Sequence, residues 1–175
     1  VEMVVRECYR AGADKVIVEW THQPLEKLHV NNRSLKTLST VEEWERQKWQ
    51  HQVDRLPAKL YLVSEDPDGL VGMNQKKNAK AAQARYGVIK PYREAMENKY
   101  KWCIAAVPGK AWAKKMFPGM RTSAAVEKLW EAILYTVRMT KSLGGEEQDG
   151  IEAWAKHNAD MCAKCEYLNS LNIVS

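Results

Sequence analysis

Three short apolar runs, separated by segments of helical character, constrain the fold of this chain most strongly. The runs are KVIVEW at Lys15–Trp20, AKLYLVS at Ala58–Ser64 and KWCIAAV at Lys101–Val107. Runs of this length that are rich in β-branched and aromatic residues predict buried strands. Strands that alternate with helices join through right-handed parallel crossovers. The sequence therefore predicts an α/β fold with a parallel three-stranded sheet that helices cover on both faces.

Helices are expected around these runs. Residues 1–10 place apolar side chains on one side of a helix that Gly12 ends. A second helix is expected over residues 39–56, because Ser39 and Glu42 match a capping box. The alanine-rich and lysine-rich segment 74–98 is interrupted by Gly87 and Pro91, which predicts a kink or two helices. Further helices are expected within 108–119, 123–139 and 151–171, whereas 21–34 and 141–150 are interpreted as loops.

Composition indicates one globular domain. The 175 residues are 45% hydrophobic and 28% charged, which is typical of a chain that buries a core and excludes a disordered one. No apolar run approaches the roughly 20 residues that a membrane-spanning helix needs. The four cysteines lack the spacing of a disulfide framework, which favours reduced thiols in a cytoplasmic protein.

Both ends of the sequence suggest that structure is missing there. The first helix is amphipathic from Val1 onward and no capping residue precedes it. Because three strands make a thin sheet, we expect a further strand before Val1 to complete it in the intact protein. Residues 171–175 (LNIVS) are interpreted as a strand that begins where the chain stops.

Two adjacent acids follow the second predicted strand. Glu65 and Asp66 precede a Pro-Asp-Gly turn at 67–69, in which the glycine suits a left-handed conformation. Ligands of open parallel sheets collect beyond the carboxyl ends of the strands. Residues 19–22 and 108–112 follow the other two strands, so the three segments are candidates to line one rim. The alternative is that the acids are solvated or cap the next helix.

Other motifs leave alternatives open. Cys162 and Cys165 form C-x-x-C in the middle of a predicted helix, which fits packing or exposed cysteines, while a thiol-redox site is the alternative. The four histidines are scattered, and no dinucleotide or phosphate loop is present. The net charge of +5 is a mild excess. A nucleic-acid-binding module remains the rival hypothesis, based on the basic residues Lys76, Lys77, Lys80, Arg85, Lys110, Lys114 and Lys115.

Four stretches resemble one family. They are VRECYRAGADKVIVEW from Val5, EDPDGL from Glu65, KPYREAMENKYKWCIAAVPGKAWAKKMFP from Lys90 and AVEKLWEAILYTVRM from Ala125. Together they resemble the N-terminal domain of the aminopeptidase T/PepS/AmpS family of metal-dependent aminopeptidases, over essentially the whole chain. The segment PGKAWAKKMFP followed by EKLWEAI is the most specific part of the resemblance.

The resemblance implies a two-domain cytoplasmic homodimer that releases N-terminal amino acids from peptides with a pair of divalent metals, zinc or cobalt. The family's ligands lie in its C-terminal domain and none maps onto this sequence, so no catalytic or metal residue is carried over. Residues 1–171 would be the N-terminal domain without its first helix and strand, and 172–175 the start of the catalytic domain.

The resemblance also defines the expected role of this stretch and its partners. Alone it would be inactive and would bind no metal, and in the parent enzyme it would form a wall over the substrate cleft. Its partners would be the catalytic domain and peptide substrates, with no nucleic acid and no membrane. The candidates for the cleft rim are Glu65, Asp66, Lys110 and Trp112.

Overall fold

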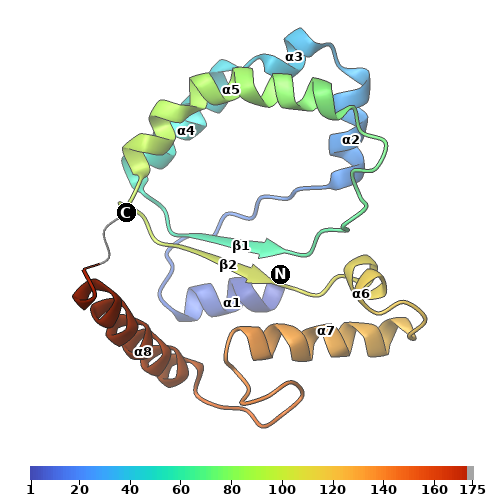
Figure 1. Cartoon of the computed structure of the whole chain (residues 1–175). Coiled ribbons are helices and arrows are strands. Elements are labelled where there is room, and N and C mark those ends of the chain that lie inside the picture. Colours follow the sequence, from blue (N-terminus) through green and yellow to red (C-terminus); the bar gives the residue numbers. More distant parts are fainter. Residues whose placement is uncertain (173–175) are drawn as a thin grey trace. The chain divides into compact units, whose positions relative to one another are not determined.

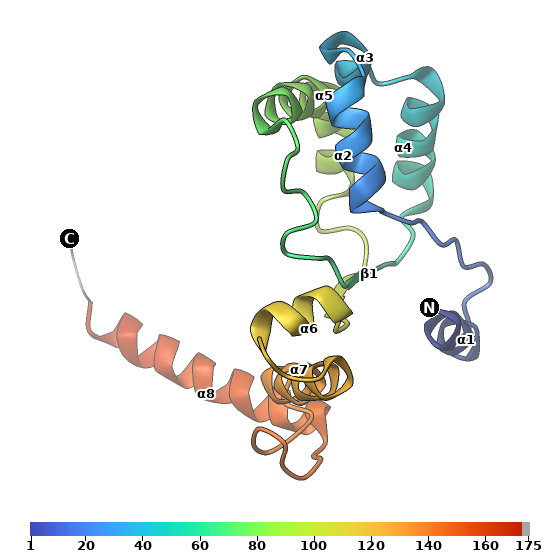
Figure 2. The ribbon, with the colours of Figure 1, turned by 90° about the vertical axis from the view of Figure 1, so that its right-hand side faces the viewer.

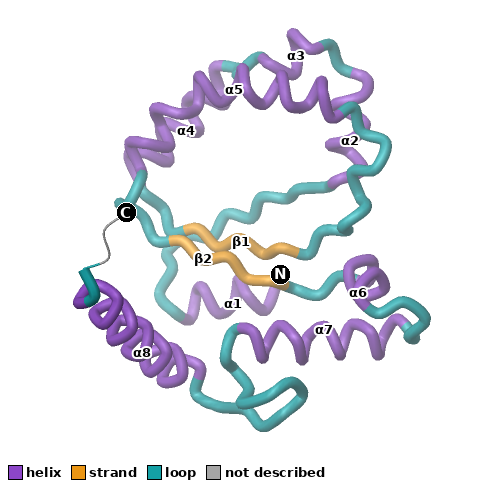
Figure 3. Tube along the Cα trace, viewed as in Figure 1, coloured by secondary structure: helices purple, strands orange, loops and turns teal. Residues whose placement is uncertain are grey.

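The computed structural model describes residues 1–172 as helices and one parallel sheet (Figures 1 and 3). The chain divides into two compact units. The first contains Val1–Val41 and Leu70–Val88, and the second contains Glu42–Gly69 together with the chain from Ile89 onward. The α/β class predicted from the sequence is therefore observed, and the chain passes between the units three times.

The first unit is helical. It contains α1 (Glu2–Arg10), α2 (Gln23–Asn32), α3 (Leu35–Ser39) and the first part of α5 (Gln75–Met96). As predicted, α1 is followed by Gly12, which adopts a φ of 90° that residues with a side chain rarely accept. The hydroxyl of Ser34 accepts a hydrogen bond of 3.0 Å from the backbone N–H of Thr37 and so caps α3.

Asn31 joins the end of α2 to the turn before α5. Its side-chain amide donates to the Gly72 carbonyl at 3.1 Å, and its side-chain oxygen accepts from the Asn74 backbone N–H at 2.9 Å. Lys77 Nζ donates to the Asn31 carbonyl at 3.3 Å. Because one side chain satisfies groups of the turn on both sides of Met73, which is buried, it fixes the start of α5 against α2.

The second unit is built around two strands. It contains the end of α5 and the elements α4 (Glu43–Arg55), β1 (Lys59–Val63), β2 (Trp102–Ala106), α6 (Lys110–Met116), α7 (Thr122–Thr136) and α8 (Gly150–Ser170). The strands pair in parallel, from Lys59 opposite Trp102 to Val63 opposite Ala106. Both occupy runs that the sequence predicts as strands.

The core of this unit lies where α6 meets α7, which are neighbours in Figures 1 and 2. Ala113 and Ala125 are fully buried and Leu129 is 3% exposed. Alanine at the contact lets the two helix backbones approach closely, because each side chain adds only one carbon. Partly buried side chains surround these three residues: Trp112, Phe117, Met120, Val126 and Ile133.

A short hairpin connects α7 to α8. Thr140 and Glu147 form an antiparallel bridge, and the Gln148 side-chain amide donates to the carbonyls of Arg138 at 3.1 Å and Thr140 at 3.2 Å. Trp154 Nε1 of α8 donates to the Val137 carbonyl at 2.9 Å. These bonds attach the start of α8 to the end of α7.

The expected strand at Lys15–Trp20 and the expected loop at 21–34 are not found. Within the described residues, 15–20 form no strand, and Trp20 is 75% exposed. A strand needs a neighbouring strand to pair with. Both described strands, β1 and β2, belong to the second unit, whereas residues 15–20 belong to the first. Segment 21–34 instead contains α2. Pro24 does not prevent this helix, since it lies in the first turn, where proline is favoured.

Three local predictions are also corrected. The capping box of α4 is formed by Glu42 and Glu45, while Ser39 is the last residue of α3. Helix α5 is one element with Pro91 inside it, so the alternative of two helices is wrong. The left-handed glycine of the turn before α5 is Gly72, with a φ of 83°, rather than Gly69.

The sheet is not buried on both faces as predicted. Paired residues of parallel strands point to the same face, so Leu60 and Ile104 lie on opposite faces. They are 45% and 59% exposed. Parallel sheets are normally covered on both sides. The described residues therefore leave apolar side chains uncovered on each face of the β1–β2 pair.

The contact between α6 and α7 gives a first prediction. Ala125→Leu tests the contact, and Ala124→Leu is the control because Ala124 is exposed on the same helix. Adding three carbons at the fully buried Ala125 should lower the free energy of unfolding by about 1–3 kcal/mol through overpacking. Ala124→Leu should change it by less than about 0.5 kcal/mol. Urea denaturation measures both, and equal effects would contradict the described core.

Candidate functional site

The candidate site is the edge where the carboxyl ends of β1 and β2 meet. The strands end in register, at Val63 and Ala106, and the Val107 backbone N–H donates to the Val63 carbonyl at 2.8 Å. Two loops leave this edge, residues 64–69 after β1 and 107–109 before α6. Because the strands are parallel, both loops start on the same side of the sheet, where ligands of such folds collect.

The two loops approach each other closely at Ser64 and Gly109. A Cβ atom added to Gly109 would lie 3.0 Å from both the carbonyl oxygen and the hydroxyl of Ser64. Real side chains seldom tolerate such a separation, and the backbone oxygen cannot rotate away. Glycine therefore permits the contact between the two loops.

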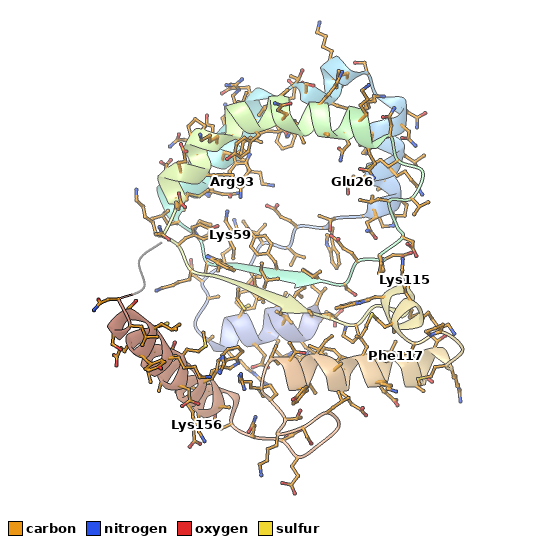
Figure 4. All side chains as sticks on the ribbon, in the orientation of Figure 1. Glu26, Lys59, Arg93, Lys115, Phe117 and Lys156 are labelled. Carbon is orange, nitrogen blue, oxygen red and sulfur yellow. The ribbon has the colours of Figure 1, made fainter. Side chains whose placement is uncertain are left out.

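A tight turn and an ion pair order the loop after β1. Asp66 accepts the Asp68 N–H through its carboxylate and the Gly69 N–H through its carbonyl, both at 2.9 Å. Asp68 then pairs with Lys115 of α6, whose side chain Figure 4 labels. Both side chains of this pair are about half exposed, so the pair orients α6 and adds little stability.

The four residues proposed for the rim occupy different environments. Glu65 is exposed, Asp66 is half-buried in the turn and Lys110 is exposed at the first position of α6. Trp112 is half-buried and packs against the core between α6 and α7. The structure thus brings the loop that carries Glu65 and Asp66 beside the start of α6, while Trp112 anchors that helix.

Sequence reasoning missed the residues that join the two loops. Ser64 was not singled out, and Gly109 appeared only within the segment 108–112. Lys115 was named only among the basic residues of the nucleic-acid hypothesis, and Asp68 only as part of a turn. The Pro-Asp-Gly pattern at 67–69 and the Pro-Gly pair at 108–109 mark both loops. No sequence signal indicates that Lys115 reaches back 47 residues to Asp68.

The described residues do not assemble a metal-binding site. Within 1–172, no three His, Cys, Asp or Glu side chains lie together in a group able to hold a metal ion. Cys162 and Cys165 are exposed on α8 and form no disulfide. The residues present therefore do not fit a divalent ion, because structural and catalytic sites need three or four convergent ligands.

The basic residues of the rival hypothesis divide between the two units. Four belong to the first unit and three to α6. Several bind other parts of the protein, since Arg85 donates to the Thr40 carbonyl and Lys114 to the Met120 carbonyl at 2.7 Å. These contacts give the side chains structural roles and do not single out a surface for nucleic acid.

A concave surface is found in the first unit rather than at this edge. It is shallow and lies against α1, lined by Val1, Val5, Arg6, Tyr9 and other residues up to Val18. Helices long and apolar enough to cross a membrane are absent from the part of the chain that the structure describes.

Comparison with known proteins connects the whole chain to one family. A family model described as thermophilic metalloprotease (M29) matches residues 1–175. Aminopeptidase PepS of Streptococcus thermophilus is 30% identical over 169 residues, which are 95% of this chain and 40% of that protein. Aminopeptidase T of Thermus thermophilus is 29% identical over 171 residues, 97% of this chain and again 40% of the relative.

A solved structure agrees with these sequence matches. Wild-type AmpT from Thermus thermophilus superimposes with a TM-score of 0.75 at 27% identity, covering 98% of this chain and 40% of that one. The chain thus spans about 40% of the length of the curated relatives and of the solved structure that it matches.

The contact between Ser64 and Gly109 is testable by Gly109→Ala. The added carbon should lower the free energy of unfolding by about 1–2 kcal/mol, since the neighbouring backbone must shift. Adding Ser64→Ala should recover only part of this loss, because the Ser64 carbonyl oxygen remains at 3.0 Å. Urea denaturation of both variants and of Ser64→Ala alone provides the comparison. A Gly109→Ala variant as stable as the unsubstituted chain would refute the close contact between Gly109 and Ser64.

Proposed function

The chain belongs to the thermophilic metalloprotease (M29) family, and we propose that it is the non-catalytic N-terminal part of a metal-dependent aminopeptidase that releases N-terminal amino acids from peptides. The observation that carries this proposal is the partial coverage. Relatives named aminopeptidases match 95–97% of this chain, yet the chain covers only 40% of their length. The parent protein then has a further domain that carries out catalysis.

The metal-ligating side chains of the described residues support the assignment of catalysis to another domain. Residues 1–172 offer no cluster of metal-ligating side chains. The divalent ions of the parent enzyme, zinc or cobalt, are therefore assigned to residues outside this chain, and no catalytic step is assigned to residues within it.

The chain is proposed to form a wall over the substrate cleft with the loops that follow β1 and β2. Support comes from their shared edge and from the ordering of the loops by the Asp66 turn and the Asp68–Lys115 pair. Glu65 and Lys110 are exposed there and have opposite charges, so they suit contacts with the charged and polar groups of a peptide. Asp66 and Trp112 would shape the rim and hold its helix.

Several finer features of the parent protein are part of the same proposal. Residues 1–171 would form one N-terminal domain, followed from 172 by the catalytic domain. The parent enzyme is proposed to act as a cytoplasmic homodimer on peptide substrates.

The purified 175-residue chain should not hydrolyse an aminoacyl-nitroanilide in the presence of added zinc or cobalt. Isothermal titration calorimetry should likewise detect no tight binding of either ion, because the described ligands do not converge. A full-length relative such as aminopeptidase T serves as the positive control for the assay. Turnover by the chain alone would overturn the assignment of catalysis to another domain.

In the full-length parent enzyme, Glu65→Gln and Lys110→Ala should raise KM for tripeptides and longer substrates while leaving kcat within about twofold, as expected when an interaction outside the reacting centre is removed. Lys156→Ala is the matched control, since Lys156 is exposed on α8 (Figure 4). Unchanged KM values in both rim variants would remove these residues from the cleft. An equal increase in the control would attribute the effect to surface charge.

A further inference from the structure

Helix α8 carries three sulfur-containing side chains within a short stretch of its second half. Met161, Cys162 and Cys165 are all exposed, and both cysteines are free thiols. The residues of α8 that are not exposed all precede residue 158. The packing of α8 therefore does not require these three side chains, and the proposed function assigns them no role.

Helical spacing brings the three side chains to one side of α8. Residues three and four positions apart are neighbours on a helix surface, and Met161 and Cys162 precede Cys165 by four and three positions. Side chains of a helix lean toward its N-terminus, so Cys165 leans toward the turn that carries the other two. Two thiols and one thioether thus share one exposed area, the sulfur patch of residues 161, 162 and 165.

The separation of the two cysteines favours a bridging ion over a disulfide. Side chains three positions apart on a helix have Cβ atoms about 5–6 Å apart, whereas a disulfide needs about 3.5–4.5 Å. An S–S bond between Cys162 and Cys165 would therefore distort α8. Two sulfur atoms on opposite sides of one ion stand roughly 4.6 Å apart, twice a metal–sulfur bond of about 2.3 Å. Such an ion spans the pair without bending the helix.

The donor atoms of the patch select the kind of ion. Thiolates and thioethers prefer soft ions such as Cu(I). A closed zinc site needs four ligands, and within 1–172 no three His, Cys, Asp or Glu side chains form a group able to hold a metal ion. His157, on the same helix, packs edge-on against Trp154 with ring centroids 5.5 Å apart. Because Cu(I) is stable with two or three sulfur donors, the patch suits this ion and not zinc.

We propose that Met161, Cys162 and Cys165 form a binding site for one soft monovalent ion of the Cu(I) class. The two thiolates are its main ligands, and the thioether is the third. Binding forms the metal–sulfur bonds and releases the two thiol protons to solvent, while the ion keeps its oxidation state. The site does not depend on the proposed function, because it lies on one helix and involves neither a peptide nor a divalent ion.

Competition for Cu(I) with the coloured chelator bicinchoninate tests the site in the 175-residue chain, under argon with ascorbate as reductant. The background carries Cys8→Ser and Cys103→Ser, so the thiols of α8 alone remain, and it should bind one Cu(I) per chain. Cys162→Ser or Cys165→Ser should each weaken binding by more than about 100-fold, since losing a group that only supports a ligand costs about 10–100-fold. Met161→Leu, which conserves volume, should weaken it by about tenfold.

A register variant separates the geometry of the patch from the mere presence of two thiols. Lys164→Cys combined with Cys165→Ser keeps two exposed positions with thiols on α8, but they are two residues apart, where side chains do not face each other. This variant should bind Cu(I) as weakly as Cys165→Ser alone. Circular dichroism verifies that each variant keeps its helix content.

Four results would overturn the proposal. The first is a background chain that does not compete for Cu(I), and the second is a cysteine-to-serine variant of the patch that keeps its affinity. The third is a register variant that binds as tightly as the background, which would show that any two thiols of α8 suffice. An unchanged affinity of Met161→Leu would contradict the third sulfur ligand.

Discussion

The parallel pairing of β1 with β2 is the contact on which the second unit depends. Its register brings Val63 and Ala106 to one edge, so the two loops that follow must share the same space. Gly109 allows those loops to approach, and the pair between Asp68 and Lys115 holds α6 against the turn. A shift of the register by one residue would separate these contacts and reverse the face of every strand side chain.

The orientation of α6 links this edge to the core. The helix begins within one residue of Gly109 and places Ala113 against Ala125 and Leu129 of α7. Trp112 packs against this core and so helps to fix α6 beside α7. Among residues 1–172, no three His, Cys, Asp or Glu side chains lie together in a group able to hold a metal ion.

Patterns within short stretches of the sequence predicted the elements that depend on residues close together in the chain. The runs at β1 and β2 were identified as strands because β-branched and aromatic residues bounded by turn residues are a strong pattern. The same pattern at Lys15–Trp20 gave no strand among the described residues, because a strand exists only with a partner. Pro24 was interpreted as part of a loop although it begins α2, and the positions of Glu65 and Asp66 followed from the end of β1. The Lys115–Asp68 pair and the Ser64–Gly109 approach join residues more than 40 positions apart, which one sequence cannot reveal.

The uncovered faces of the strand pair have a practical consequence for work with this polypeptide. Leu60, Trp102 and Ile104 present apolar surface to solvent on a short sheet, and such surface promotes the self-association of chains in solution. Preparations of this polypeptide should stay dilute and at low ionic strength, where the net positive charge is least screened and keeps molecules apart. Light scattering would then distinguish colloidal clustering from a defined assembly before any biochemical assay is interpreted.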